Sequence, residues 1–238
     1  MKLTKLMAIV AILTATLGFT ACNDNGGDSN RLYFSNVVTY EGNSGGYVNF
    51  SFQEMNDAQP IIIRAQGQMP ADVTIGRRVF ISFSSTATNL TDGMVVSLTQ
   101  CVAIPNVKAS INEPVPSDWK DISMIYLQTI FRSGNWINLA ALVPNNPDKT
   151  VTPKLIFDPA TIDAEYPEAY MIFEGLNPEM GAVNNATYIA TYDIADVWGL
   201  PGCRGIKIHV NNTNNSVNGG SSQSCEVSEG GELITIKK

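Results

Sequence analysis

Catalysis that relies on histidine or cysteine has few candidate side chains in this 238-residue chain, which contains one histidine and four cysteines. The sequence GNSGG at residues 42–46 matches the G-x-S-x-G pattern, in which a hydrolase presents its serine on a turn between a strand and a helix. Ser44 would also need a histidine to accept its proton, and His209 lies in the distant second half of the chain. Strand-like residues flank Ser44 on both sides. We therefore interpret GNSGG as a hairpin turn and assign no catalytic residue.

Four carboxylates cluster in one irregular stretch, at Asp158, Asp163, Glu165 and Glu168. Two carboxylates can serve a glycosidase as general acid and as nucleophile or base. This spacing is also that of a solvated acidic loop, and it lacks the Asp and Gly pattern of an EF-hand. We favour the acidic loop, with weak calcium binding as the alternative, and predict no metal or cofactor site. The single histidine also excludes multi-histidine metal sites and histidine relays.

The histidine and the tryptophans have both a structural and a ligand-binding interpretation. His209 shares the polar parity of IKIHV with Lys207, which favours a solvent-facing strand residue over a ligand contact. Three tryptophans, Trp119, Trp136 and Trp198, could form a platform for a sugar. We favour a place in the core or at a domain joint for them, because Trp136 alternates with an apolar strand face.

The cysteines divide by position. Cys203 and Cys225 flank a polar stretch, residues 211–224, that cannot pack a core. In an exported protein such a pair favours a disulfide, which would stabilise the fold by about 3 kcal/mol in the entropic model. The alternative is two reduced thiols that never meet. Cys101 remains as an unpaired small strand residue.

Residues 1–22 have the organisation of a lipoprotein signal peptide. Lys2 and Lys5 precede an apolar run that ends at Phe19, and small residues precede Cys22. We predict cleavage before Cys22 and a diacylglycerol on its sulfur, which would hold the protein on a membrane. An ordinary signal peptide with an incidental cysteine is the alternative. Residues 23–31 are polar and glycine-rich, as expected of a flexible tether.

The charge balance narrows the choice of partner. The chain carries 15 Lys+Arg and 22 Asp+Glu, a net charge of −7, and its pI is about 4.7. Loss of the two signal lysines leaves 13 against 22, or −9. A protein with this negative charge is not expected to bind nucleic acid, and anionic lipid would repel it. We therefore predict attachment through the lipid to the outer membrane, with the periplasmic face favoured and surface exposure as the alternative.

Apolar residues alternate with polar ones almost throughout the chain after residue 31, which predicts an all-β protein. Turn sequences divide the strands into five before residue 105 and seven after it. The expected strands lie at about 33–40, 46–53, 60–66, 77–85, 93–104, 122–132, 135–143, 153–157, 170–174, 186–194, 204–211 and 232–237. Five short strands suit a small barrel over residues 32–110, and seven suit a sandwich over 111–238. One large sandwich is the alternative.

The chain resembles the NigD-like lipoproteins of Bacteroidales. The resemblance rests on the lipoprotein start, on IGRRVFISFS and DGMVVSLTQCVAI before a proline-rich joint, and on DWKDISMIYLQTIFRSGNWINLAALVP, ATYIATYDI and RGIKIHV after it. It implies an OB-like N-terminal barrel, a C-terminal β-sandwich and a place in the cell envelope. It implies no activity and no site residues.

The sequence thus favours a lipid-anchored protein that binds an envelope protein, a peptide or a glycan without catalysis. The competing hypothesis is a glycan-active hydrolase that uses carboxylates alone, or a carbohydrate-binding lipoprotein.

Overall fold

The computed structural model describes residues 32–144, 150–176, 185–214, 225–229 and 231–238. The predicted signal peptide, Cys22 and the tether lie outside the described residues, as does most of the polar stretch 211–224. No helix within the described ranges has the length and apolar character needed to cross a membrane.

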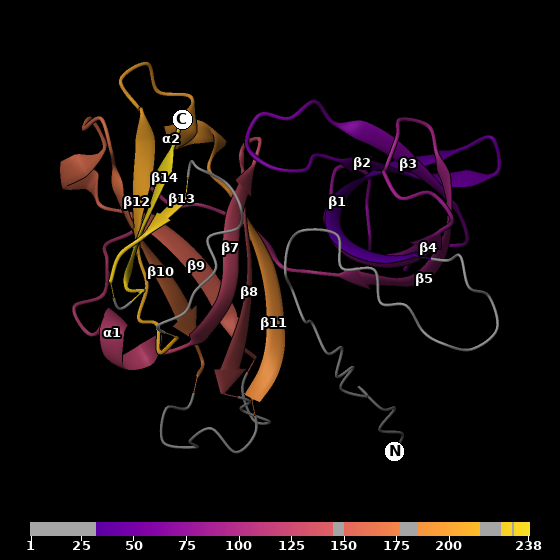
Figure 1. The fold of residues 1–238 in the computed structure, drawn as a ribbon. Helices are drawn as coiled ribbons and strands as arrows, with labels where there is room; N and C mark the ends of the chain where they lie inside the picture. The colour runs from indigo at the N-terminus through magenta and orange to yellow at the C-terminus, as the bar shows by residue number, and fades with distance from the viewer. Residues whose placement is uncertain (1–31, 145–149, 177–184, 215–224, 230) are drawn as a thin grey trace.

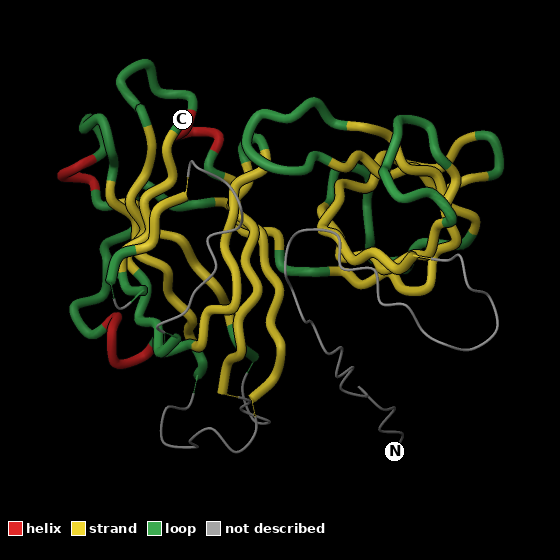
Figure 2. Tube along the Cα trace, viewed as in Figure 1, coloured by secondary structure: helices red, strands yellow, loops and turns green. Residues whose placement is uncertain are grey.

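The first part of the chain forms a closed five-stranded barrel with the strand order β1-β2-β3-β5-β4 (Figures 1 and 2). The barrel closes because β4 pairs with β1 along eight successive residues. Its strands are β1 (Leu32–Ser44), β2 (Tyr47–Phe52), β3 (Ile61–Gln66), β4 (Arg78–Ser85) and β5 (Val95–Ala103). The strands fill the interior with alternate side chains, among them Val38, Phe50, Ile63, Ile81 and Phe83, all fully buried.

The GNSGG motif is a hairpin turn, as predicted. Ser44 pairs with Tyr47 at the end of β1 and β2, and Gly45 and Gly46 are the two residues between them. Both glycines have positive φ, +59° and +80°, as a type I′ turn requires.

The second part forms a β-sandwich of two sheets. One sheet has four strands in the order β6-β11-β8-β7, and the other has five in the order β13-β14-β12-β10-β9. The strands are β6 (Asn106–Lys108), β7 (Tyr126–Ser133), β8 (Trp136–Pro144), β9 (Thr152–Phe157), β10 (Glu168–Glu174), β11 (Asn185–Asp193), β12 (Gly205–His209), β13 (Cys225–Val227) and β14 (Leu233–Lys237). Three one-turn helices, α1 (Trp119–Ile122), η1 (Pro159–Thr161) and α2 (Ala195–Trp198), lie between strands of the described chain.

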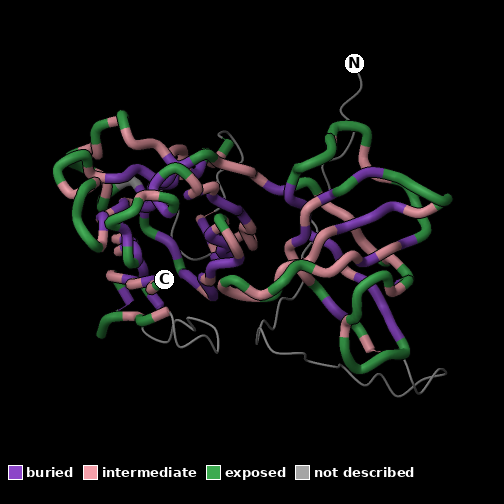
Figure 3. Tube along the Cα trace, turned by 90° about the horizontal axis from the view of Figure 1, so that it is seen from above, coloured by how far each residue is buried: buried purple, intermediate pink, exposed green. Residues whose placement is uncertain are grey.

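A single apolar core lies between the two sheets of the sandwich. Ile137 and Leu139 of β8 face it from one side, and Met171 and Phe173 of β10 face it from the other. The barrel has a separate core, so the described residues bury two hydrophobic clusters. Figure 3 shows buried segments running through both parts, with exposed loops around them.

The all-β prediction is confirmed, but the change from barrel to sandwich comes earlier than residue 110. β6 lies within the predicted barrel segment, yet its residues pair in parallel with Thr191–Asp193 of β11 in the sandwich. Ser110 then bonds the backbone of β9 on the opposite sheet, accepting from Phe157 and donating to Leu155. Strands as short as β6 and β13 carry too few alternating residues to be predicted from pattern alone.

Two buried arginines join the barrel to the sandwich. Arg132 of β7 donates to both carboxylate oxygens of Asp57 in the β2–β3 loop, at 2.8 and 2.9 Å. Its guanidinium lies 4.4 Å from the ring centroid of Trp198. Arg78 of β4 donates to Asn138 of the sandwich at 2.9 Å and faces the ring of Trp136. Burial lowers the pKa of Arg78 to about 10.

The backbones of the two parts also meet at this joint. Asn56 donates its N–H to the carbonyl of Arg132 at 2.8 Å, and its own carbonyl accepts from Gly134 at 2.7 Å. Gly134 has a φ of +55°, and a Cβ there would collide with the side-chain amide of Gln53. The positive φ therefore favours glycine at this turn, and a larger residue would also have to displace the side-chain amide of Gln53.

Candidate functional site

The sandwich carries a cluster of polar and aromatic side chains on the outer face of its five-stranded sheet. β10 and β12 run parallel there, and their register places Glu168 beside Lys207 and Tyr170 beside His209. The intervening residues, Ala169 and Ile208, point into the core and are fully buried. Because side chains alternate along a strand, the four polar residues must share the opposite face.

Aromatic rings pack together in this cluster. Tyr170 and His209 stack with their ring centroids 4.6 Å apart and an interplanar angle of 13°. The indole of Trp119, from α1, meets Tyr170 at 5.2 Å and His209 at 6.5 Å with edge-on geometry. The α1 segment contacts β10, so the connection between β6 and β7 brings Trp119 onto the sheet. We call Trp119, Glu168, Tyr170, Lys207 and His209 the Trp119 patch.

Glu168 is the anionic centre of the Trp119 patch. Its Oε2 lies 2.9 Å from Nε2 of His209, and its Oε1 lies 3.8 Å from Nζ of Lys207. An ionised carboxylate can only accept, so Nε2 of His209 carries the proton of this hydrogen bond. The pKa of Tyr170 is raised, first by loss of hydration and then by the negative charges of Glu168 and Asp158.

The polar groups of the Trp119 patch are reachable from solvent. The side chains of His209, Glu168 and Lys207 keep 27%, 31% and 39% of their surface exposed. Their mutual contacts hold these side chains in place, and a ligand could still replace the water on their exposed surface. The arrangement supplies aromatic edges and faces, one anion, one cation and an imidazole within one small area.

The structure brings together three residues that the sequence analysis raised separately, His209, Trp119 and Glu168. His209 lies on the outer face of its strand, as its parity predicted. Two other carboxylates of the acidic stretch direct their side chains to other partners, although the backbone N–H of Asp158 donates to the carbonyl of Glu168. Glu165 pairs with Arg204 at 3.2 Å, and Asp158 accepts from the backbone N–H of Ala160 at the start of η1.

The expected place in the core or at the joint is wrong for Trp119, which lies on the outer face of the five-stranded sheet, whereas Trp136 and Trp198 lie at the joint as predicted. Trp136 faces Arg78 and Trp198 faces Arg132, so each ring covers a buried guanidinium. Ser44 is on the barrel and His209 on the sandwich, and they belong to separate sheets. Among the described residues, no group of three or more His, Cys, Asp or Glu side chains could hold a metal ion.

The predicted disulfide is wrong for this structure, in which Cys203 and Cys225 are free thiols. Cys225 pairs with Ile236, which in turn pairs with Ile206, so Cys225 lies two strands away from β12. Two strand spacings amount to about 10 Å, whereas a disulfide needs Cα atoms within about 7 Å. Cys203 is buried just before β12, and its thiol donates to the carbonyl of Gly205.

Sequence reasoning missed Tyr170 and the two joint arginines. Tyr170 shares the parity of Glu168, so the alternation in EAYMIFE could have placed it outside the core. Arg78 lies on the outer parity of β4, which predicts exposure, and the sandwich covers it. No local signal in the sequence indicates that the sandwich packs over Arg78.

Comparisons with known proteins establish the fold. No family model matches the chain, and no curated protein matches it. A protein of unknown function from Bacteroides vulgatus is 15% identical, with a TM-score of 0.58 over 87% of this chain and 90% of the other. A toxin-related protein from Parabacteroides distasonis is 10% identical, with a TM-score of 0.54 over 87% and 93%.

A third solved structure carries the family name that the sequence resembles. It is a NigD-like immunity protein from Bacteroides caccae, 11% identical, with a TM-score of 0.53 over 85% of this chain and 90% of that one. The chain therefore shares the fold of NigD-like proteins through both the barrel and the sandwich. Identities this low show the fold and not an activity.

Proposed function

We propose that this chain is a lipid-anchored protein of the cell envelope that acts by binding a glycan, with the Trp119 patch as its recognition surface. The observation that carries the proposal is the convergence of Trp119, Tyr170 and His209 around the carboxylate of Glu168. These residues come from three separate segments that the fold brings onto one sheet face.

The chemistry of the patch suits a hydroxyl-rich ligand. The C–H groups of a sugar ring carry small positive charges, and the face of an aromatic ring is negative. Carboxylate, imidazole and ammonium groups beside the rings supply acceptors and donors for sugar hydroxyls. Glu168 and Lys207 hold opposite charges, so the patch needs no charged ligand to balance it.

A binding role without catalysis is consistent with the names of three fold neighbours, which are an immunity protein, a toxin-related protein and a protein of unknown function. Both oxygens of Glu168 contact basic side chains, Lys207 and His209. These contacts hold the carboxylate in one position, as suits a group that binds a ligand by hydrogen bonds. Membrane attachment rests on the N-terminal sequence, in which Cys22 follows an apolar run and two small residues.

Binding to a glycan array tests the proposal. The array carries bacterial capsular, O-antigen and peptidoglycan oligosaccharides, and the full mature chain is applied as wild type and as Trp119→Ala. We expect wild-type binding that falls at least about tenfold in the variant, the loss typical of a central aromatic contact. Tyr126→Ala is the control, because Tyr126 is an exposed aromatic residue, 42% accessible, on the other sheet.

Two outcomes would overturn the glycan proposal. One is the absence of wild-type binding to any oligosaccharide of the array, and the other is equal loss of binding in Trp119→Ala and Tyr126→Ala. Release of shortened oligosaccharides that stops in Glu168→Gln would favour the hydrolase instead.

The anchor is tested separately by detergent partition of the protein expressed with its own N-terminus. We expect the wild type in the detergent phase of Triton X-114 and Cys22→Ser in the aqueous phase, because two or three acyl chains hold a protein on a membrane. Equal partition of the two proteins would contradict lipidation at Cys22.

A further inference from the structure

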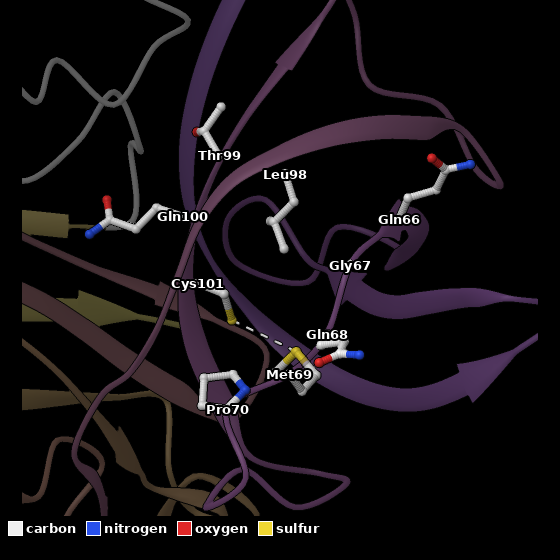
Figure 4. A pocket seen from close by; sticks show the side chains of 9 residues that line it. All are labelled: Gln66, Gly67, Gln68, Met69, Pro70, Leu98, Thr99, Gln100 and Cys101. Carbon is white, nitrogen blue, oxygen red and sulfur yellow. Dashed lines mark hydrogen bonds between the residues drawn. The ribbon is translucent and has the colours of Figure 1, made fainter.

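The barrel contains an opening between β3 and β5, at the point where the two strands part (Figure 4). It has a volume of about 460 Å³ and lies between segments 66–70 and 98–101. That volume falls in the range of sites that hold small ligands or peptide side chains.

The opening exists because β3 and β5 pair over only a short length. Their parallel pairing covers Arg64–Gln66 against Val95–Ser97, and β3 ends there. β5 continues to Ala103 with an irregularity in its pairing to β4 opposite Ser82 and Phe83. Within the described parts of the chain, the pairing of residues 99–103 is with β4 alone, so this length of β5 is an edge facing the opening.

The lining of the opening is uncharged. Its floor is apolar, with Leu98 and Met69 beside the thiol of Cys101, which lies 3.7 Å from the sulfur of Met69. Gln66, Gln68 and Gln100 also line the opening, and their side-chain amides can both donate and accept. A matching ligand is neutral, has one apolar group for the floor, and presents donors and acceptors in alternation.

We propose that an extended, uncharged segment of a partner polypeptide binds here by strand addition to β5. A peptide backbone has the alternating N–H and C=O groups that an open strand edge recognises, and one of its side chains would enter the floor between Leu98 and Met69. The described lining contains no aromatic ring, which distinguishes it from the Trp119 patch and disfavours a sugar. This site lies on the barrel and is independent of the proposed glycan site on the sandwich.

A library of uncharged hexapeptides tests the site. The peptides contain Ser, Thr, Gln, Ala, Val and Leu, carry blocked ends and a fluorophore, and are applied to the mature chain. We expect saturable binding of a subset of them and amide shifts in an NMR titration that centre on residues 98–103. Methylation of alternate backbone nitrogens in a selected peptide should weaken it at least about tenfold, because strand addition depends on main-chain donors.

Two variants locate the binding on the protein. Leu98→Trp fills the floor, and Gln100→Ala removes a lining amide while leaving the core intact, so each should weaken the selected peptide. Gln59→Ala is the matched control, because Gln59 is an exposed glutamine of the β2–β3 loop. The proposal is overturned by a library without binders, by a methylated peptide that binds as well as its parent, or by equal binding to Gln100→Ala and Gln59→Ala. Displacement of the bound peptide by sugars, and not by unlabelled peptide, would also overturn the proposal.

Discussion

Replacing Asp57 by asparagine should loosen the joint between the barrel and the sandwich. The side chain of Arg132 keeps only 1% of its surface exposed, whereas that of Asp57 keeps 72%. The guanidinium donates to both oxygens of Asp57 and to the carbonyl of Gly134, and its Nε has no hydrogen-bond partner among the described residues. The asparagine side chain in the Asp57→Asn variant would keep one acceptor and lose the negative charge, so a buried cation would remain without its counter-charge.

The size of the effect follows from the unequal burial of the two partners. Removing one member of a fully buried pair costs about 3–5 kcal/mol, and an exposed pair contributes about 0–1 kcal/mol. Solvent screens Asp57, so we expect Asp57→Asn to lower the free energy of unfolding by about 1–2 kcal/mol. For a body of this size that corresponds to a fall in Tm of about 3–6 °C.

The loss should depend on pH. The pKa of Asp57 is lowered from 3.8, first by the hydrogen bond with Arg132, against the opposing effect of burial. A carboxyl with a depressed folded-state pKa stabilises the fold fully above its unfolded pKa, and the stabilisation is lost as pH falls through the folded value. Wild type and Asp57→Asn should therefore differ at pH 7, and the difference should shrink below about pH 4.

Urea titrations at pH 7 and pH 3, followed by tryptophan fluorescence, measure both effects. Trp198 reports on the joint because its ring lies against Arg132. Asp72→Asn is the control, since Asp72 is an exposed carboxylate in the β3–β4 loop. A difference at pH 7 no larger than that of the control would refute the assignment, as would a difference that keeps its full size at pH 3.

Three further predictions concern single positions. Gly134→Ala should destabilise the protein by about 1–3 kcal/mol in a thermal melt, because Gly134 has a φ of +55° and an added methyl meets Gln53; an unchanged Tm would contradict this. Tyr192→Phe should leave stability unchanged or raise it by up to about 1 kcal/mol, because the buried Tyr192 hydroxyl has no hydrogen-bond partner among the described residues; a loss above about 1 kcal/mol would reveal a partner. Cys225, whose pKa is raised to about 11, first by burial and then by Glu226, should react with iodoacetamide at pH 8 far more slowly than in urea; mass spectrometry of the peptide measures this, and equal rates would contradict the burial.

Local pattern predicts the strands of this chain well because alternation is a local property. Val79, Ile81 and Phe83 fill the barrel, and Ile206 and Ile208 fill the sandwich, each from the parity that the sequence assigns. The turn after Ser44 can also be predicted locally, because its two central residues have positive φ and glycine adopts positive φ without steric cost.

The joint and the candidate sites depend on contacts between distant segments, and this is why pattern alone does not find them. Arg78 and Phe80 lie on the outer parity of β4, yet they are only 3% and 6% exposed, and Arg78 bonds Asn106 and Asn138 outside the barrel. The Trp119 patch similarly requires the parallel pairing of β10 with β12, in which Glu168 lies opposite Lys207 and Tyr170 opposite His209 although each pair is far apart in the sequence. The alternation of polar and apolar residues predicts the face of the sheet on which a side chain lies. Contacts between distant segments determine which residues pack against that face.

The joint gives the two proposed sites a fixed relation that affects how a partner would bind. Arg78 and Arg132 each bridge the barrel and the sandwich, and a backbone pairing between Asn56 and Ser133 adds to them. A partner that engages both the barrel opening and the Trp119 patch would bind the second site intramolecularly, so its affinity would depend on the stiffness of the joint. Asp57→Asn should then weaken such a partner while leaving a single hexapeptide or oligosaccharide unaffected. Equal weakening of the small ligands would instead place Asp57 within one of the sites.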